Sequence, residues 1–118
     1  MVLDQGGNMI KVFISQPMNG KAEEEIRFER EIAIKDAKKQ VEETYPEDWD
    51  EDGNQVEIMD TVLKDFSTDT HPLVYLGESI KMLADADVVY FAKGWENARG
   101  CCIEHECAKK YGKHVMHW

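Results

Sequence analysis

The chain is poor in basic residues, in long apolar runs and in widely spaced cysteines. Lys and Arg total 14 against 24 Asp and Glu, so the formal net charge is −10 and phosphates would be repelled, which argues against a nucleic-acid-binding protein. No apolar run approaches the roughly 18 residues of a membrane span. The three cysteines, Cys101, Cys102 and Cys107, lie too close together to staple a fold, and this usage indicates a reducing, cytoplasmic setting.

Familiar nucleotide-binding signatures are missing as well. The chain contains neither a Walker A loop nor a G-x-G-x-x-G fingerprint after its first predicted strand. What it does contain is 118 residues with 42% apolar content, which suits one domain with its own core. Residues 1–8 are polar and glycine-bearing, so we expect a flexible N-terminal extension followed by a single domain over residues 9–118.

Strand and helix patterns alternate along the chain. Short β-branched and aromatic runs predict strands at residues 10–14, 55–59, 88–92 and 113–117. Apolar residues spaced by three or four positions predict helices at residues 21–43, 72–84 and 101–111. Such alternation implies a parallel sheet with right-handed crossovers. The predicted fold class is therefore α/β, a three-layer flavodoxin/Rossmann-like domain with a four- to five-stranded parallel sheet.

Two loops are candidates for ligand binding. In a flavodoxin-like strand order the first and third strands are neighbours, so the loops at residues 15–20 and 93–100 would face each other across one crevice. Both loops contain glycine, which allows a ligand to approach the backbone closely. The first loop precedes a helix whose amides could meet a phosphate, although taken alone it is a weak signal and a plain strand-to-helix turn is the simpler interpretation.

Glu104 is the candidate reactive group. The third predicted helix places it on a stripe with Cys101, Ala108 and Tyr111, near the N-terminal end. The helix dipole would keep this carboxylate ionised, and partial burial would raise its basicity. An ionised carboxylate at a crevice suits a nucleophile. The alternative is a glutamate that merely stabilises the helix N-terminus.

The segment from Asp85 to Gly112 resembles the nucleoside 2-deoxyribosyltransferase superfamily. Its members begin a strand with Ala-Asp, here Ala86-Asp87, and carry a glycine four residues before a helical glutamate, here Gly100 and Glu104. The segment Gln16-Pro17-Met18-Asn19-Gly20, with residues 94–106, is similar to short uncharacterised bacterial and phage proteins assigned to that superfamily.

This resemblance implies a function. Family enzymes attack the anomeric carbon of a deoxyribosyl group with the glutamate, here Glu104, and form a covalent glycosyl-enzyme intermediate. The substrate would be a small nucleoside or nucleotide, with no cofactor and no metal, and the sites of a homo-oligomer would be completed by a neighbouring subunit. The residues expected to hold the substrate are Ser15, Gln16, Pro17, Met18, Asn19, Gly20, Trp95, Asn97, Arg99 and Gly100.

Two positions depart from the family pattern. The family carries an Asp that helps protonate the leaving base, and Ser79 stands in its place, with Glu78 adjacent. The family also often has Asp or Ser where this chain has Ala98. Two alternatives therefore stay open: a nucleotide-binding module without turnover, and a structural oligomer whose crevice is filled by its own side chains.

Other polar and aromatic residues have competing readings. Cys101, Cys102 and Cys107 with His105 could ligate a metal or act as nucleophiles, but small core cysteines and an outward-facing His105 are the simpler interpretation. Trp95 could stack on a base, contact another subunit or anchor a lid.

Two further positions are expected to be structural. His71 before Pro72 is expected to start a helix. Arg27 and Arg30 are expected on a solvated or ion-paired face.

Overall fold

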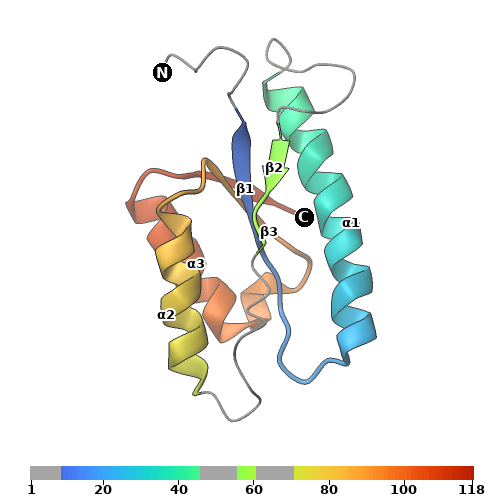
Figure 1. Cartoon of the computed structure of the whole chain (residues 1–118), viewed down its shortest axis with the longest axis vertical. Coiled ribbons are helices and arrows are strands. Elements are labelled where there is room, and N and C mark those ends of the chain that lie inside the picture. The colour runs from blue at the N-terminus through green and yellow to red at the C-terminus, as the bar shows by residue number, and fades with distance from the viewer. Residues whose placement is uncertain (1–8, 46–55, 61–70) are drawn as a thin grey trace.

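A computed structural model describes residues 9–45, 56–60 and 71–118 (Figure 1). The predicted extension at residues 1–8 lies outside this part of the chain. In chain order, the elements are β1 (Ile10–Ser15), α1 (Glu23–Thr44), β2 (Val56–Ile58), α2 (Pro72–Leu83), β3 (Val88–Phe91), the 3₁₀ helix η2 (Trp95–Asn97), α3 (Arg99–Lys110) and β4 (His114–His117). The predicted alternation of strands and helices is confirmed.

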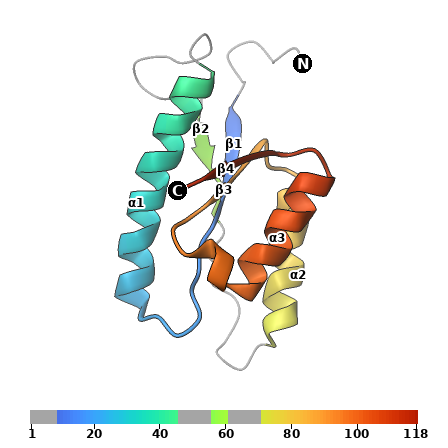
Figure 2. The ribbon, with the colours of Figure 1, turned by 180° about the vertical axis from the view of Figure 1, so that it is seen from behind.

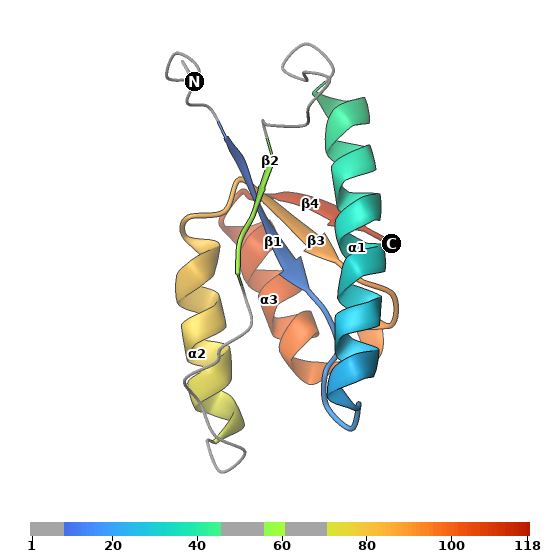
Figure 3. The same ribbon diagram turned by 45° about the vertical axis from the view of Figure 1, so that its right-hand side comes forward.

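The four described strands form one parallel sheet in the order β2-β1-β3-β4. Helix α1 covers one face of the sheet, and α2 and α3 cover the other, as Figure 3 shows. Seen from behind in Figure 2, α3 lies beside α2, and β4 crosses in front of the other strands. The protein is thus a three-layer α/β domain of the flavodoxin/Rossmann-like kind, as the sequence predicted.

Alternate strand residues supply two separate cores, because successive side chains of a strand point to opposite faces of the sheet. The core on the α1 side includes Val12, Ile14, Ala33, Ala37, Val41, Val88 and Tyr90. The core on the α2–α3 side includes Phe13, Leu83, Ala86, Val89, Phe91 and Ala108. Strands β1 and β3 are buried on both faces, which explains why they read as continuous apolar runs in the sequence.

Polar side chains fix the ends of α2. The Nδ1 atom of His71 accepts a hydrogen bond from the backbone N–H of Leu73 at 3.1 Å, and Pro72 occupies the first turn, so the prediction that His71 starts a helix is confirmed. Past the other end of α2, the Lys113 ammonium donates to the carbonyl oxygens of Ala84 and Ala86 at 3.0 and 2.8 Å. The chain after α3 is thereby tied to the chain after α2.

The region before α3 differs from the prediction. The short helix η2 was not predicted, and α3 begins at Arg99, two residues earlier than expected. Gly94, with φ of 86°, makes the turn that ends the extended chain and allows η2 to form. Glu104 therefore lies in the second turn of α3, where the helix dipole acts less strongly than in the first. Among the described helices, none is long and apolar enough to cross a bilayer.

Candidate functional site

The loops after β1 and β3 meet at one end of the sheet. The two strands are direct neighbours, with Ser15 in register with Phe91 at their carboxyl ends. A Cβ atom added at Gly94 would lie 3.8 Å from Cγ of Pro17, so the loops are in contact beyond the strands. This is the position at which open α/β sheets bind ligands, because the connections on either side lead to opposite faces.

Glu104 and Ser15 form a buried hydrogen bond at this end of the sheet. The Ser15 hydroxyl donates to Oε1 of Glu104 at 2.6 Å, joining the last residue of β1 to the second turn of α3. The Glu104 side chain is buried, as the predicted stripe required, together with Cys101 and Ala108. Tyr111, the fourth member of that stripe, is exposed because α3 ends at Lys110. The short distance indicates a charge-assisted hydrogen bond that fixes the orientation of the carboxylate.

Two hydroxyl groups act against the effect of burial on Glu104. Removal from water raises the pKa of the Glu104 carboxyl, and hydrogen bonds from Ser15 and Ser79 oppose that rise. Burial also raises the pKa of the neighbouring Cys101 thiol to about 11, and the negative charge of Glu104 adds to the shift. Cys101 is consequently a protonated thiol at neutral pH, which removes the activation that a cysteine nucleophile requires.

The structure therefore brings Ser79 to Glu104, although α2 and α3 come from separate parts of the chain. Ser79 stands where the resemblance implies an acid, and here its hydroxyl is close enough to the carboxylate to oppose the rise in its pKa. Glu78 is placed differently, since its carboxylate pairs with the ammonium of Lys81 at 3.0 Å on the same helix. Of the two residues proposed beside Glu104 for catalysis, Ser79 influences the pKa of the Glu104 carboxyl, and Glu78 is engaged with Lys81.

The predicted substrate-binding residues of the two loops differ in how far they are exposed. Ser15 and Gln16 are buried, whereas Pro17, Trp95 and Gly100 are half-buried. The exposed members of the set are Met18, Asn19, Gly20, Asn97 and Arg99. The buried members are thus already engaged within the protein, and the exposed members form the outer rim of the two loops.

Trp95 is held by aromatic contacts that the sequence did not reveal. Its indole stacks on the imidazole of His105 with ring centroids 4.2 Å apart, and on that of His117 at 5.4 Å. The Nε2 atoms of the two histidines are 2.9 Å apart and share a hydrogen bond. The expectation that His105 points outward is wrong, because Trp95 of η2 and His117 of β4 pack against its side of α3. This stack favours the reading of Trp95 as the anchor of its loop.

Arg27, Arg30 and Cys102, which the sequence also singled out, have structural partners. Arg27 pairs with Glu23 at 3.0 Å on α1, and the Arg30 guanidinium donates to the carbonyl oxygen of Met59 at 2.9 Å. The exposed Cys102 thiol donates to the carbonyl oxygen of Glu96 at 3.3 Å. Within residues 9–45, 56–60 and 71–118, no three His, Cys, Asp or Glu side chains are grouped to hold a metal ion.

Comparison with known proteins defines the family of this domain. Neither the curated proteins nor the solved structures contain a match to the chain. One family model, described as a domain of unknown function, matches residues 10–117 and so extends from the first residue of β1 to the last residue of β4. On that match, the chain belongs to the family called Domain of unknown function, DUF4406.

Proposed function

We propose that this protein is a deoxyribosyltransferase-like or N-glycosidase-like enzyme that cleaves the N-glycosidic bond of a nucleoside or nucleotide. The observation that carries the proposal is the buried hydrogen bond from Ser15 to Glu104 at the crevice between β1 and β3. Structural carboxylates of this depth are usually neutralised by a basic partner, whereas Glu104 is oriented by the hydroxyl of Ser15, and the hydroxyls of Ser15 and Ser79 oppose the rise in its pKa that burial causes. That arrangement suits a carboxylate that reacts with a carbon centre.

The proposed mechanism proceeds with retention of configuration. An oxygen of Glu104 forms a bond to the anomeric carbon, while the carbon–nitrogen bond breaks and its electron pair leaves with the base. The departing base then takes up a proton. Water or a second base next attacks the anomeric carbon of the glycosyl-enzyme, releases the Glu104 carboxylate and gives its own proton to solvent. Ser15 keeps one carboxylate oxygen fixed throughout, which leaves the other to react.

The alternative is a nucleotide-binding module without turnover. Ser79 favours it, because a hydroxyl that hydrogen-bonds Glu104 is a poor proton donor for a leaving base. The free cysteines support our further proposal that the protein works in the cytoplasm.

The direct test is base release by the wild-type protein and by Glu104→Gln. Deoxynucleosides and deoxynucleotides are incubated with each protein, and free base is measured by chromatography. We expect Glu104→Gln to lower the rate by at least about 10³-fold while the fold is kept, because the amide preserves shape and removes the nucleophile. Rapid quenching with intact-mass detection should reveal one deoxyribosyl adduct on the wild type.

Glu106→Gln is the matched control, since Glu106 is an exposed carboxylate on the same helix. It should release base at the wild-type rate. A well-folded Glu104→Gln protein that retains activity would refute the assignment of the nucleophile. If the wild type binds nucleotides and releases no base from any of them, the binding module is the correct function.

A further inference from the structure

Gln16 carries an unsatisfied hydrogen-bond acceptor inside the protein. The residue is 6% exposed, and its Nε2 atom donates to the carbonyl oxygen of Ile26 at 3.1 Å. Within the described part of the chain, its Oε1 atom has no hydrogen-bond partner. A buried acceptor left unpaired costs about 1–3 kcal/mol, so such an atom calls for a specific explanation.

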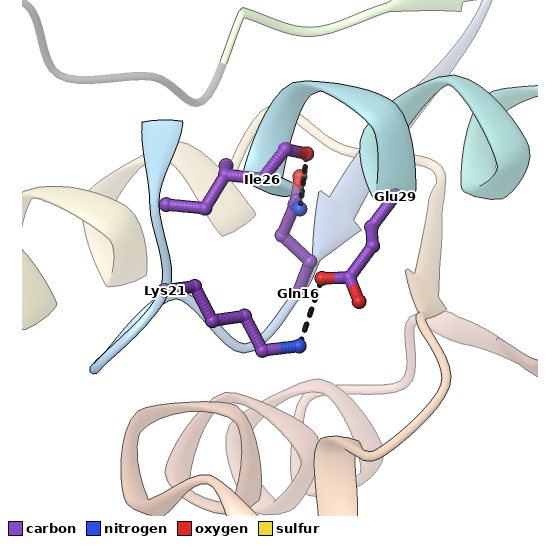
Figure 4. Close-up of polar contacts among 4 residues, drawn as sticks. All are labelled: Gln16, Lys21, Ile26 and Glu29. Atoms are coloured by element: carbon purple, nitrogen blue, oxygen red, sulfur yellow. Dashed lines mark hydrogen bonds and ion pairs between the residues drawn. The ribbon is translucent and has the colours of Figure 1, made fainter. Parts of the chain in front are cut away.

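The orientation of this carboxamide is fixed by its surroundings. Turning the amide over would place Oε1 against the carbonyl oxygen of Ile26, and two acceptors would then face each other. Figure 4 shows the side chain reaching from the end of β1 toward Ile26, with the ion pair of Lys21 and Glu29 beside it. That pair, at 2.8 Å and half-buried, ties the loop after β1 to α1. The acceptor is therefore preorganised rather than free to rotate toward a new partner.

Gln16 directly follows Ser15, the residue that orients Glu104. Successive side chains of an extended segment point to opposite faces, so Ser15 reaches α3 while Gln16 reaches α1. Both start from the carboxyl end of β1, where the crevice opens between β1 and β3. A ligand over the strand end would lie next to the two residues from which these side chains start.

We propose that Oε1 of Gln16 accepts a hydrogen bond from an N–H or O–H group of the substrate and thereby determines which nucleosides bind. This inference rests on the proposed function, because it assumes that the nucleoside lies over Glu104. The donor is either the amino group of a base or a hydroxyl of the sugar, since these groups share the required chemistry. An analogue that lacks the donor leaves Oε1 unpaired and is discriminated against.

The test compares ligands that differ by one donor. Binding is measured by calorimetry in the Glu104→Gln protein, so that no ligand is consumed. The parent is whichever common deoxynucleoside or its 5′-monophosphate binds most tightly, and its analogues lack the base amino group, the 3′-hydroxyl or, in the nucleoside series, the 5′-hydroxyl. We expect one deletion to weaken binding about tenfold and the others to have little effect, and the sensitive analogue identifies the donor.

Gln16→Met in the same background should bind the parent and the sensitive analogue within about twofold of each other, because the acceptor is gone. Gln16→Asn, which stays polar and withdraws the oxygen by one methylene, should behave in the same way and guards against a folding defect of the first variant. Gln40→Met is the matched control, since Gln40 donates from α1 to Asp36 and to the backbone of His117, and it should keep the full discrimination.

Discrimination between the parent and the sensitive analogue that survives Gln16→Met and Gln16→Asn would overturn the inference. Equal affinities for the parent and every analogue in the protein that keeps Gln16 would also overturn it. Base release by the protein with Glu104 intact is measured separately. Release without any dependence on Gln16 refutes this inference and leaves the proposed function standing. If binding depends on Gln16 and no base is released, this inference stands and the proposed function is refuted.

Discussion

Glu104 is a buried carboxyl group whose ionisation lowers the stability of the folded protein. Its pKa in the folded protein is raised by burial above the value near 4.3 of an unfolded chain, so its effect on stability is most favourable below about pH 4 and is lost as the pH rises through the raised pKa. Glu104→Gln should therefore stabilise the protein at neutral pH. Urea unfolding of both proteins across the pH range should show a difference that shrinks toward acid pH.

A difference that is constant with pH, or a less stable Glu104→Gln protein at neutral pH, would show that the two hydroxyls fully compensate the burial of the charge. Glu106→Gln again serves as the control and should change the stability little, because its side chain is exposed.

Ser79 is the residue at which the proposed chemistry can be improved. Its hydroxyl contacts Glu104, so Ser79→Asp would place a second carboxyl group beside the first. Two carboxyls in contact cannot both ionise easily, so the pair would hold a proton near neutral pH and could deliver it to the leaving base. General acid help of this kind is typically worth about 10²–10⁴-fold.

We therefore expect Ser79→Asp to increase release of unactivated bases selectively, with little effect on a nitrophenyl deoxyriboside, whose leaving group needs no proton. The measurement is the ratio of the two rates in each protein. A wild type that already cleaves ordinary deoxynucleosides as fast as the activated substrate would contradict the premise that the acid is missing.

Some individual residues of the candidate site could be predicted from the sequence, and others could not. Helical periodicity was enough to predict that Glu104 is buried with Cys101, and the strand pattern predicted that Ser15 lies at the carboxyl end of the first strand. The proton-sharing pair of His105 and His117 depends on how a strand edge meets a helix, and no local pattern encodes that contact. The unpaired oxygen of Gln16 cannot be predicted from the sequence either, since it depends on the absence of a hydrogen-bond donor near Oε1 in the folded protein.

The elements themselves were predictable because each one is amphipathic or fully buried with the right period. All four strands and all three long helices were expected in the observed order, with ends displaced by one or two residues. Among the described residues the exception is η2, whose three residues are too short to show a period. Its formation depends on the left-handed turn at Gly94 and on Trp95 packing against Phe91, which is a tertiary contact.

The start of α3 offers a test of where the ligand lies. A Cβ atom at Gly100 would make an ordinary contact with Leu76 at 3.9 Å, so packing does not require glycine there. Gly100→Ala should fold normally and gain up to about 0.5 kcal/mol of stability, because alanine favours the helix. If the substrate approaches this backbone, the added methyl group should lower the rate of base release at least about tenfold.

Gly77→Ala is the matched control, since Gly77 lies in α2 with nothing within 4 Å of an added Cβ atom. It should gain similar stability and keep its activity. Equal activities of the two alanine variants would place the ligand away from the N-terminus of α3.

For the whole molecule we propose a homo-oligomer. Leu83 is the one fully buried residue of α2, while Leu73 and Val74 are 68% and 46% exposed, and Trp118 is 58% exposed. A small domain buries a modest share of its surface, so apolar side chains left outside are commonly covered by association. We expect sedimentation at micromolar concentration to give at least a dimer, and Leu73→Glu to shift it toward monomer. A clean monomer for the wild type would contradict this proposal.

The hydrogen bond between Ser15 and Glu104 also constrains how the molecule is made. Its two residues are 89 positions apart, so Ser15 is synthesised long before Glu104. Nor can β1 and β3 bring the two residues together until α3 has emerged and packed on the finished sheet. The nascent chain therefore cannot form this hydrogen bond until α3, residues Arg99–Lys110, has been made and has packed on the sheet.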